Sequence, residues 1–288
     1  GEEFMSHVFE ALRKSEGHKE NGDFLSPEAF FGTIESAPEL TSVPSENAKI
    51  RPESRLVVWD SPHTLAADRY RLLRMHLEKL QGGGKLRTLL LTSASPQDGK
   101  STVVLNLATI LAAQGKHKVL IIEADLRCPS LTRRLGLGRW EGLSGCLAHG
   151  IDPISAVRRI EPMGFYLLPA GELVANPTEL LQSERLTQLV QSMSGRFDWV
   201  LIDSPPTSPI ADTLALKPRA DACLLVVRAG KTPREAVEES IRQFGPGFVL
   251  GIVLNGLEGL EREYSEYYSK YYGDAGARKP DVAPKPAL

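Results

Sequence analysis

Short apolar runs recur through the middle of the chain, and each ends in polar or turn-forming residues. They occupy Leu89–Leu91, Lys118–Ile122, Phe165–Leu168, Trp199–Ile202, Asp221–Val227 and Phe248–Leu254. Runs of this kind are typical of parallel strands buried on both faces. Between them, helical spacing of apolar residues marks Ser61–Leu80, Val103–Gln114, Asn176–Leu181, Leu186–Met193 and Arg234–Phe244. Strands that alternate with helices indicate βαβ units, so we predict an α/β fold with a mainly parallel central sheet flanked by helices.

The first of these runs leads into a phosphate-binding motif. A loop of small and turn-forming residues follows Leu91 and ends in Gly99, Lys100, Ser101 and Thr102, after which the helical pattern begins. Strand, loop, lysine, hydroxyl and helix form the layout of a P-loop, whose backbone N–H groups bind anions. We therefore predict a P-loop NTPase-like fold in which Lys100 reaches the β- and γ-phosphates and Ser101 holds Mg²⁺.

One residue departs from the P-loop pattern G-x-x-x-x-G-K-[ST]. The first glycine of the pattern is Ala94 here, and alanine tolerates positive φ poorly. The alternative interpretation is a chance Gly-Lys-Ser on a surface turn, which the strand before it and the helix after it disfavour.

Carboxylates follow two of the predicted strands. Glu123 and Asp125 stand at i and i+2 after Lys118–Ile122, and we expect them to point the same way at the edge where open α/β sheets bind ligands. Asp203 ends the run from Trp199 and fits a Walker B strand, whose carboxylate supports Mg²⁺. The alternatives are structural: Asp125 could cap the segment that starts at Pro129, Glu123 could be a surface residue, and Asp203 could cap a helix or turn.

The flanking segments are different in composition. We expect residues 1–4 to be a cloning remnant, 5–54 a short amphipathic helix and a flexible linker, 55–260 the folded domain, and 261–288 a tail that ends in disorder. Five of the seven tyrosines lie in the tail: Tyr264, Tyr267, Tyr268, Tyr271 and Tyr272. Their spacing is also that of a helical packing stripe, so composition alone leaves their role open.

Composition narrows the function classes. A net charge of −2 and a pI near 6.4 argue against a nucleic-acid partner. Cys128, Cys146 and Cys223 lack the spacing of a metal site or a disulfide framework, which fits a reducing compartment. No apolar run reaches the ~18 residues of a membrane-spanning helix, so we expect another chain to bring the protein to any membrane.

Together these motifs resemble the bacterial tyrosine kinases (BY-kinases) over about Pro62–Tyr272. Ser93–Thr102 is similar to the family's Walker A form, Ile121–Arg127 to its D-x-D-x-R motif, and Val200–Pro206 to its Walker B motif. Pro169–Gly171, followed by Asn176-Pro177 and Glu179–Leu181, resembles a further family segment. Asp68, Arg71 and Arg74, on a loosely shared helix face, are similar to the E-x-x-R-x-x-R oligomerisation motif, although their spacing alone favours a solvated charged face.

The resemblance implies an ATP- and Mg²⁺-dependent tyrosine autokinase that phosphorylates the five tail tyrosines, mainly between subunits. It assigns catalysis to Lys100, Glu123, Asp125, Arg127 and Asp203, and the metal to Ser101, Asp125 and Asp203. It assigns nucleotide binding to Ser95, Gln97, Asp98, Gly99, Lys100, Ser101, Thr102 and Asn255. Asp125 and Glu123 are both candidates for the general base, and Asn255 is equally well a residue that starts a loop.

The sequence departs from the family pattern at two positions, and the family also implies a cellular setting. Glu123 stands for the first Asp of D-x-D, which could slow catalysis, and Asp68 stands for a Glu in the oligomerisation motif. The family regulates synthesis and export of capsular polysaccharide or exopolysaccharide. The resemblance thus implies a homo-oligomeric ring, a membrane-protein activator, a cognate phosphotyrosine phosphatase, and a cytoplasmic protein at the inner face of the plasma membrane.

Two alternatives remain at this point. An ATPase switch of the MinD or ParA type shares the fold and Walker motifs, but it carries a second lysine where Ser95 stands here. A pseudokinase scaffold would bind nucleotide without transferring phosphate, and Glu123 is its only direct support.

Overall fold

A computed structural model describes residues 40, 43–50, 54–83, 86–208 and 212–257. Its centre is an eight-stranded sheet with the strand order β1-β4-β5-β3-β6-β2-β7-β8. Every neighbouring pair is parallel except β4 and β5, which run antiparallel. The strands are β1 Ser45–Asn47, β2 Thr88–Ser93, β3 Val119–Glu123, β4 Arg158–Glu161, β5 Phe165–Leu168, β6 Trp199–Asp203, β7 Ala222–Arg228 and β8 Val249–Asn255. The predicted fold class, a mainly parallel sheet, is confirmed.

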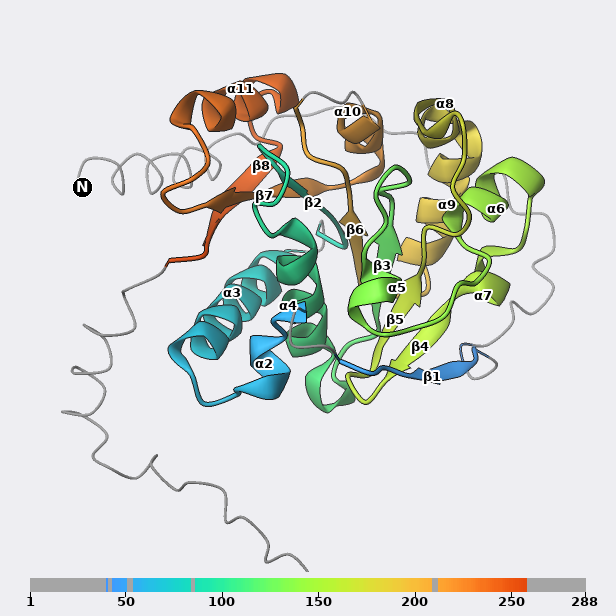
Figure 1. Ribbon diagram of the computed structural model, residues 1–288, viewed down its shortest axis with the longest axis horizontal. Helices are drawn as coiled ribbons and strands as arrows, with labels where there is room; N and C mark the ends of the chain where they lie inside the picture. Colours follow the sequence, from blue (N-terminus) through green and yellow to red (C-terminus); the bar gives the residue numbers. More distant parts are fainter. Residues whose placement is uncertain (1–39, 41–42, 51–53, 84–85, 209–211, 258–288) are drawn as a thin grey trace, which may run out of the picture.

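Helices cover both faces of this sheet, so the domain has three layers (Figure 1). The group that contains α3 and α4 lies on one face, while α8, α9 and α11 lie on the other. The helical segments are α2 Val57–Asp60, α3 Leu65–Gln81, α4 Lys100–Ala112, η4 Ala113–Gly115, α5 Leu131–Arg134, α6 Leu143–His149, α7 Pro153–Ala156, α8 Pro177–Gln182, α9 Glu184–Ser194, α10 Asp212–Leu216, η5 Lys217–Arg219 and α11 Arg234–Phe244.

Side-chain alternation along the strands fills two separate cores. In β2, Leu89 and Leu91 pack into the core beneath α4, whereas Leu90 packs into the core on the opposite face. All three are fully buried. The residues of β3 and β6 are buried as well, whichever face of the sheet they point to. Burial on both faces is why these strands read as continuous apolar runs in the sequence. The arrangement brings the carboxyl ends of β2, β3 and β6 side by side.

The start of one predicted helix and the edge of the sheet differ from expectation. The helix expected from Ser61 begins at Leu65, because the Thr64 hydroxyl caps its first turn by accepting from the Ala67 amide at 3.4 Å. The edge strand β1 and its neighbour β4 were not predicted. β1 lies inside the segment 5–54 that we expected to be linker, and it pairs with β4. The folded part therefore begins before residue 55.

Several predicted features lie outside the described residues. These are the cloning remnant, the short N-terminal helix and the five tail tyrosines. Within the described ranges, none of the helices combines the length and apolar character that crossing a membrane needs.

Candidate active site

The P-loop joins β2 to α4 and places its glycine against a neighbouring strand. Gly99 adopts φ +95°, and a side chain there would lie 2.0 Å from Asn255 Nδ2. Asn255, at the end of β8, donates from this amide to the Asp98 carbonyl at 2.9 Å. Ala94 is buried and is not among the positive-φ residues, which in this loop are Gln97 and Gly99. The departure at Ala94 is therefore compatible with the loop conformation.

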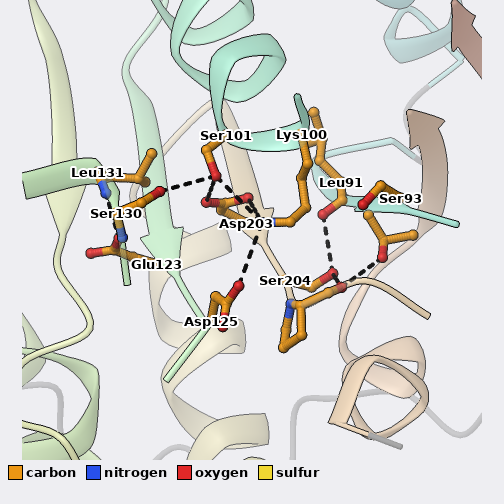
Figure 2. Close-up of polar contacts among 12 residues, drawn as sticks. Leu91, Ser93, Lys100, Ser101, Glu123, Asp125, Ser130, Leu131, Asp203 and Ser204 are labelled. Carbon is orange, nitrogen blue, oxygen red and sulfur yellow. Dashed lines mark hydrogen bonds and ion pairs between the residues drawn. The ribbon is translucent and has the colours of Figure 1, made fainter. Parts of the chain in front are cut away.

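Lys100 and Ser101 open α4 and meet the end of β6. Lys100 Nζ lies 2.8 Å from Asp203 Oδ1, and the Ser101 hydroxyl donates to Asp203 Oδ2 at 3.1 Å (Figure 2). Asp203 is 1% exposed. Burial raises the pKa of Asp203, and the charge of Lys100 and the two hydrogen bonds act against that rise. The predicted Walker A and Walker B residues thus form one buried polar cluster.

Asp125 joins this cluster from the loop after β3. Its Oδ2 lies 3.8 Å from Lys100 Nζ, and its Oδ1 accepts from the Cys128 amide at 3.0 Å. The structural alternative, that Asp125 caps the segment starting at Pro129, is wrong: this oxygen holds the loop at Cys128, and the amides that open α5 are bound by Glu123. The other oxygen faces Lys100, together with Asp203, so two carboxylates surround one ammonium group.

Glu123, the last residue of β3, has a different set of partners. Oε1 accepts from the amides of Ser130 and Leu131, both at 2.6 Å, and Oε2 accepts from the Ala170 amide at 3.2 Å. Burial raises the pKa of Glu123, and these three amides oppose the rise. We expected Glu123 and Asp125 to point the same way, but they contact different groups, because the chain leaves the strand after Glu123 and the alternation of a strand no longer applies.

Arg127 lies outside the polar cluster. Its Nε donates to Asp212 Oδ2 at 2.7 Å, and Nη2 donates to the hydroxyl of Thr178 at 2.9 Å. Asp212 is 1% exposed, and its hydrogen bond raises the pKa of Arg127. Arg127 thereby ties the loop after β3 to the starts of α8 and α10. The structure brings Lys100, Ser101, Asp125 and Asp203 together and places Arg127 beside them.

The other predicted nucleotide-binding residues shape the loop. The Ser95 amide donates to Asp98 Oδ2 at 2.9 Å, so the Asp98 carboxylate is used inside the loop. Gln97 is exposed at its tip, and the Thr102 hydroxyl lies 3.4 Å from Arg134 Nη1. Their contacts to nucleotide stay predictions.

Sequence reasoning missed four residues that contact this site. Ser130 donates to the Ser101 hydroxyl at 3.2 Å, and Thr232 donates to Asp98 Oδ1 at 2.7 Å. Thr178 and Asp212 hold Arg127. Ser130 follows Pro129 after the D-x-D-like motif, and we interpreted this segment only as one that Asp125 could cap. Thr232 has no neighbour in the sequence that marks it as a site residue.

Comparison with known proteins identifies the family. The AAA domain family matches residues 97–244. The tyrosine-protein kinase YwqD of Bacillus subtilis (strain 168) is 32% identical over 230 residues, which are 79% of this chain and 95% of YwqD. The kinase domain of Escherichia coli tyrosine kinase ETK superimposes with a TM-score of 0.66 at 30% identity, covering 70% of this chain and 79% of that domain. The chain belongs to the bacterial tyrosine-protein kinases. The resemblance and the enzyme class that the motifs predicted are both confirmed.

The coverage of relatives by this kinase is uneven. The succinoglycan biosynthesis transport protein ExoP of Rhizobium meliloti is 29% identical over 260 residues, which are 85% of this chain but only 32% of ExoP. The kinase thus spans nearly all of YwqD and about a third of ExoP. The septum site-determining protein MinD of Pyrococcus horikoshii, complexed with Mg-ADP, has a TM-score of 0.50 at 23% identity, which shows a shared fold alone.

The predicted oligomerisation residues of the kinase lie on α3 and make contacts within the chain. Arg71 Nη1 lies 2.6 Å from Asp68 Oδ1, and Nη2 donates to the Pro62 carbonyl at 2.7 Å. Arg74 Nη1 donates to the carbonyl of Ile110 on α4 at 3.2 Å. Asp68 and Arg71 pair with each other whereas Arg74 contacts α4, and the part of the three residues in assembly stays a prediction.

Proposed function

We propose that this chain is an ATP-dependent protein-tyrosine autokinase that phosphorylates its own C-terminal tyrosine cluster. The observation that carries the proposal is the convergence of Lys100, Ser101, Asp125 and Asp203 at the carboxyl ends of neighbouring strands. This is the edge at which open α/β sheets bind ligands. Membership of the tyrosine-protein kinases supports the choice of acceptor.

The residues present fit Mg²⁺ and ATP. The Ser101 hydroxyl and the carboxylates of Asp203 and Asp125 are oxygen donors, which Mg²⁺ prefers, and Mg²⁺ commonly binds through one or two carboxylates and substrate phosphates. Phosphate oxygens of the nucleotide would supply further ligands. When bound, the ion would neutralise charge between the β- and γ-phosphates.

Each side chain of the cluster has a role in this proposal. The Lys100 ammonium group would move from Asp203 to the phosphate oxygens. Ser101 and Asp203 would hold the metal. A tyrosine hydroxyl has a pKa of about 10, so at neutral pH it attacks poorly without a base. Asp125 is the candidate that could assist it, because one of its oxygens faces the cluster whereas both oxygens of Glu123 are held by backbone amides.

The tail and its partners are the finer part of the proposal. Each phosphotyrosine adds about −1.5 to −2 charges, so five add roughly −8 to −10 to a chain near −2. A tail with that charge would be repelled from an acidic, ATP-loaded site. Unphosphorylated subunits would form a ring, with each tail in the neighbouring site, and phosphorylation would release it. Light scattering tests this: an unchanged mass after phosphorylation contradicts it.

The setting is proposed on the same basis. A relative named for succinoglycan biosynthesis transport supports a role in polysaccharide synthesis or export. We propose a membrane-protein activator with a cytosolic segment, an opposing phosphotyrosine phosphatase, and a cytoplasmic location at the inner face of the plasma membrane.

The deciding experiment is intact mass spectrometry. Protein is treated with phosphatase and then with ATP and Mg²⁺, for the wild type and for Lys100→Met. We expect stepwise phosphate additions that map to Tyr264, Tyr267, Tyr268, Tyr271 and Tyr272 and that disappear in the variant. Additions that persist in Lys100→Met would point to a contaminating kinase. No additions, with or without an activator segment, would contradict the proposal.

A further inference from the structure

Glu123 caps the start of α5, a helix whose own N-cap residue makes no capping hydrogen bond. α5 is only four residues long, and its N-cap residue, Ser130, makes no side-chain hydrogen bond to the first turn. The amides of Ser130 and Leu131 donate to Glu123 Oε1 instead. These amides are among the donors that a helix start leaves without partners, and a buried carboxylate satisfies them well.

This arrangement leaves the Ser130 hydroxyl available for another partner. An N-cap serine ordinarily accepts from an amide of its own helix. Here the hydroxyl donates to Ser101 Oγ at 3.2 Å, and Ser101 in turn donates to Asp203 Oδ2 (Figure 2). A hydroxyl oxygen has two lone pairs, of which Ser130 occupies one, and Lys100 Nζ lies 3.4 Å from the same oxygen. These three partners together fix the direction in which the Ser101 hydroxyl points.

We propose that Glu123 and Ser130 are positioning residues for the metal-binding hydroxyl of Ser101, and that Glu123 is not the general base. The inference rests on the proposed function, which assigns Mg²⁺ to Ser101 and Asp203. The path runs from the Glu123 carboxylate through the Ser130 backbone to the Ser130 hydroxyl, and from there to Ser101. Outer-shell partners of this kind orient metal ligands.

The contacts of Glu123 argue against a role as base. A base must offer an oxygen lone pair within hydrogen-bond reach of the proton that it takes. Glu123 accepts from three backbone amides, on α5 and on the segment at Ala170, and it is 1% exposed. The extra methylene of Glu123 relative to the family's Asp extends its reach toward those amides. The replacement of Asp by Glu123, which was the only direct support for a pseudokinase, is here part of the arrangement that holds Ser101.

The first test measures how nucleotide binding depends on Mg²⁺. A fluorescent ADP analogue is titrated at a series of Mg²⁺ concentrations with the wild type, Ser130→Ala and Ser130→Thr. We expect Ser130→Ala to need about tenfold more Mg²⁺ and Ser130→Thr, which keeps the hydroxyl, to behave as the wild type. Binding measured in EDTA should be equal for all three. An unchanged Mg²⁺ requirement in Ser130→Ala overturns the inference, and a wild type without Mg²⁺ dependence overturns the proposed metal site as well.

The second test separates positioning from base catalysis. Glu123→Gln keeps an oxygen for Ser130 and Leu131 but turns an NH₂ group toward the Ala170 amide, so two donors face each other. We expect phosphate transfer by Glu123→Gln to be weak at low Mg²⁺ and to recover at saturating Mg²⁺. Glu123→Asp should likewise need more Mg²⁺, because its carboxylate is too short to hold α5. Transfer that stays lost at every Mg²⁺ concentration, with normal Mg²⁺-dependent binding, would identify Glu123 as the base.

A matched control is available on another short helix. α7 is also four residues long, and its N-cap Asp152 accepts from the Ser155 amide at 3.2 Å. Asp152→Asn removes a capping charge away from the P-loop. We expect it to leave the Mg²⁺ requirement unchanged; a shift equal to that of Glu123→Gln would show that the assay reports general helix stability and would overturn the inference.

Discussion

The carboxylate of Asp98 accepts a 2.7 Å hydrogen bond from the hydroxyl of Thr232, which lies in the connection between β7 and α11. Thr232 Oγ1 in turn accepts from the Arg228 amide at 2.8 Å, so the hydroxyl is fixed in place by the end of β7. Because the other Asp98 oxygen accepts from Ser95 inside the loop, the conformation of the P-loop depends on a residue more than a hundred positions away.

This relationship predicts that Thr232→Val weakens nucleotide binding. Valine has the shape of threonine without the hydroxyl, so the Asp98 oxygen loses its partner while the packing is kept. One such hydrogen bond contributes about 1 kcal/mol, which corresponds to roughly a fivefold weaker Kd. Isothermal titration with ADP and Mg²⁺ measures it. Thr232→Ser serves as the control and should bind as the wild type; equal loss in both variants would mean that the methyl group matters and the hydroxyl does not.

In the ion pair of Arg127 and Asp212, replacing one partner should destabilise the protein more than replacing the other. Arg127 is 42% exposed, whereas Asp212 is 1% exposed. Arg127→Ala leaves a buried carboxylate with the Thr178 hydroxyl and should lower the free energy of unfolding by about 3 kcal/mol. Asp212→Asn leaves an arginine that water can solvate and should cost about 1 kcal/mol. Urea denaturation of both variants and of the double variant measures this.

The double variant provides the internal check for that pair. It should be more stable than Arg127→Ala alone, because it no longer buries an uncompensated charge. Two single variants of equal stability, with additive effects, would contradict the asymmetry.

The sequence predicted the buried half of the fold and missed the polar edge. β2, β3, β6 and β7 are apolar at nearly every position, because helices cover both sides of the sheet. β1 reads Ser-Glu-Asn and lies at the edge of the sheet, where it pairs with β4. Its strand character therefore depends on a tertiary contact and not on a local sequence pattern.

The candidate site divides in the same way. Lys100, Ser101, Asp125 and Asp203 were found because motif order places them at strand ends and helix starts, and those ends meet at one edge. The orientation of Glu123 could not be predicted, since it depends on where α5 and the Ala170 segment lie in space. Thr232 and Asp212 come from distant connections, and neither has a neighbour in the sequence that indicates its partner.

The contact of Arg74 with α4 predicts a loss of stability that is separate from assembly. Arg74 donates to the Ile110 carbonyl, one of the last carbonyls of α4, which lack partners within the helix. Arg74→Met should lower the free energy of unfolding by about 1 kcal/mol at protein concentrations where only monomer is present. Chemical denaturation at two concentrations tests this. A loss seen only at the higher concentration would assign Arg74 to a subunit contact alone.

The lowered pKa of Glu78 predicts that its contribution to stability is lost in acid. Burial alone would raise the pKa of Glu78, but hydrogen bonds from Lys116 and His117 and the charge of Arg74 outweigh it and lower the pKa. A carboxylate whose folded pKa lies below its unfolded value, which is about 4.3, stabilises the protein above that unfolded value. It loses this contribution as the pH falls through the folded pKa. Glu78→Gln should therefore be less stable than the wild type by about 0.5–1 kcal/mol at pH 7, and the difference should shrink as the pH falls through the folded pKa of Glu78. Urea denaturation across this pH range measures it, with Glu238→Gln, which removes an exposed pairing partner of Arg234, as the control. A difference between wild type and Glu78→Gln that persists unchanged into acid would show that shape, and not charge, makes Glu78 stabilising.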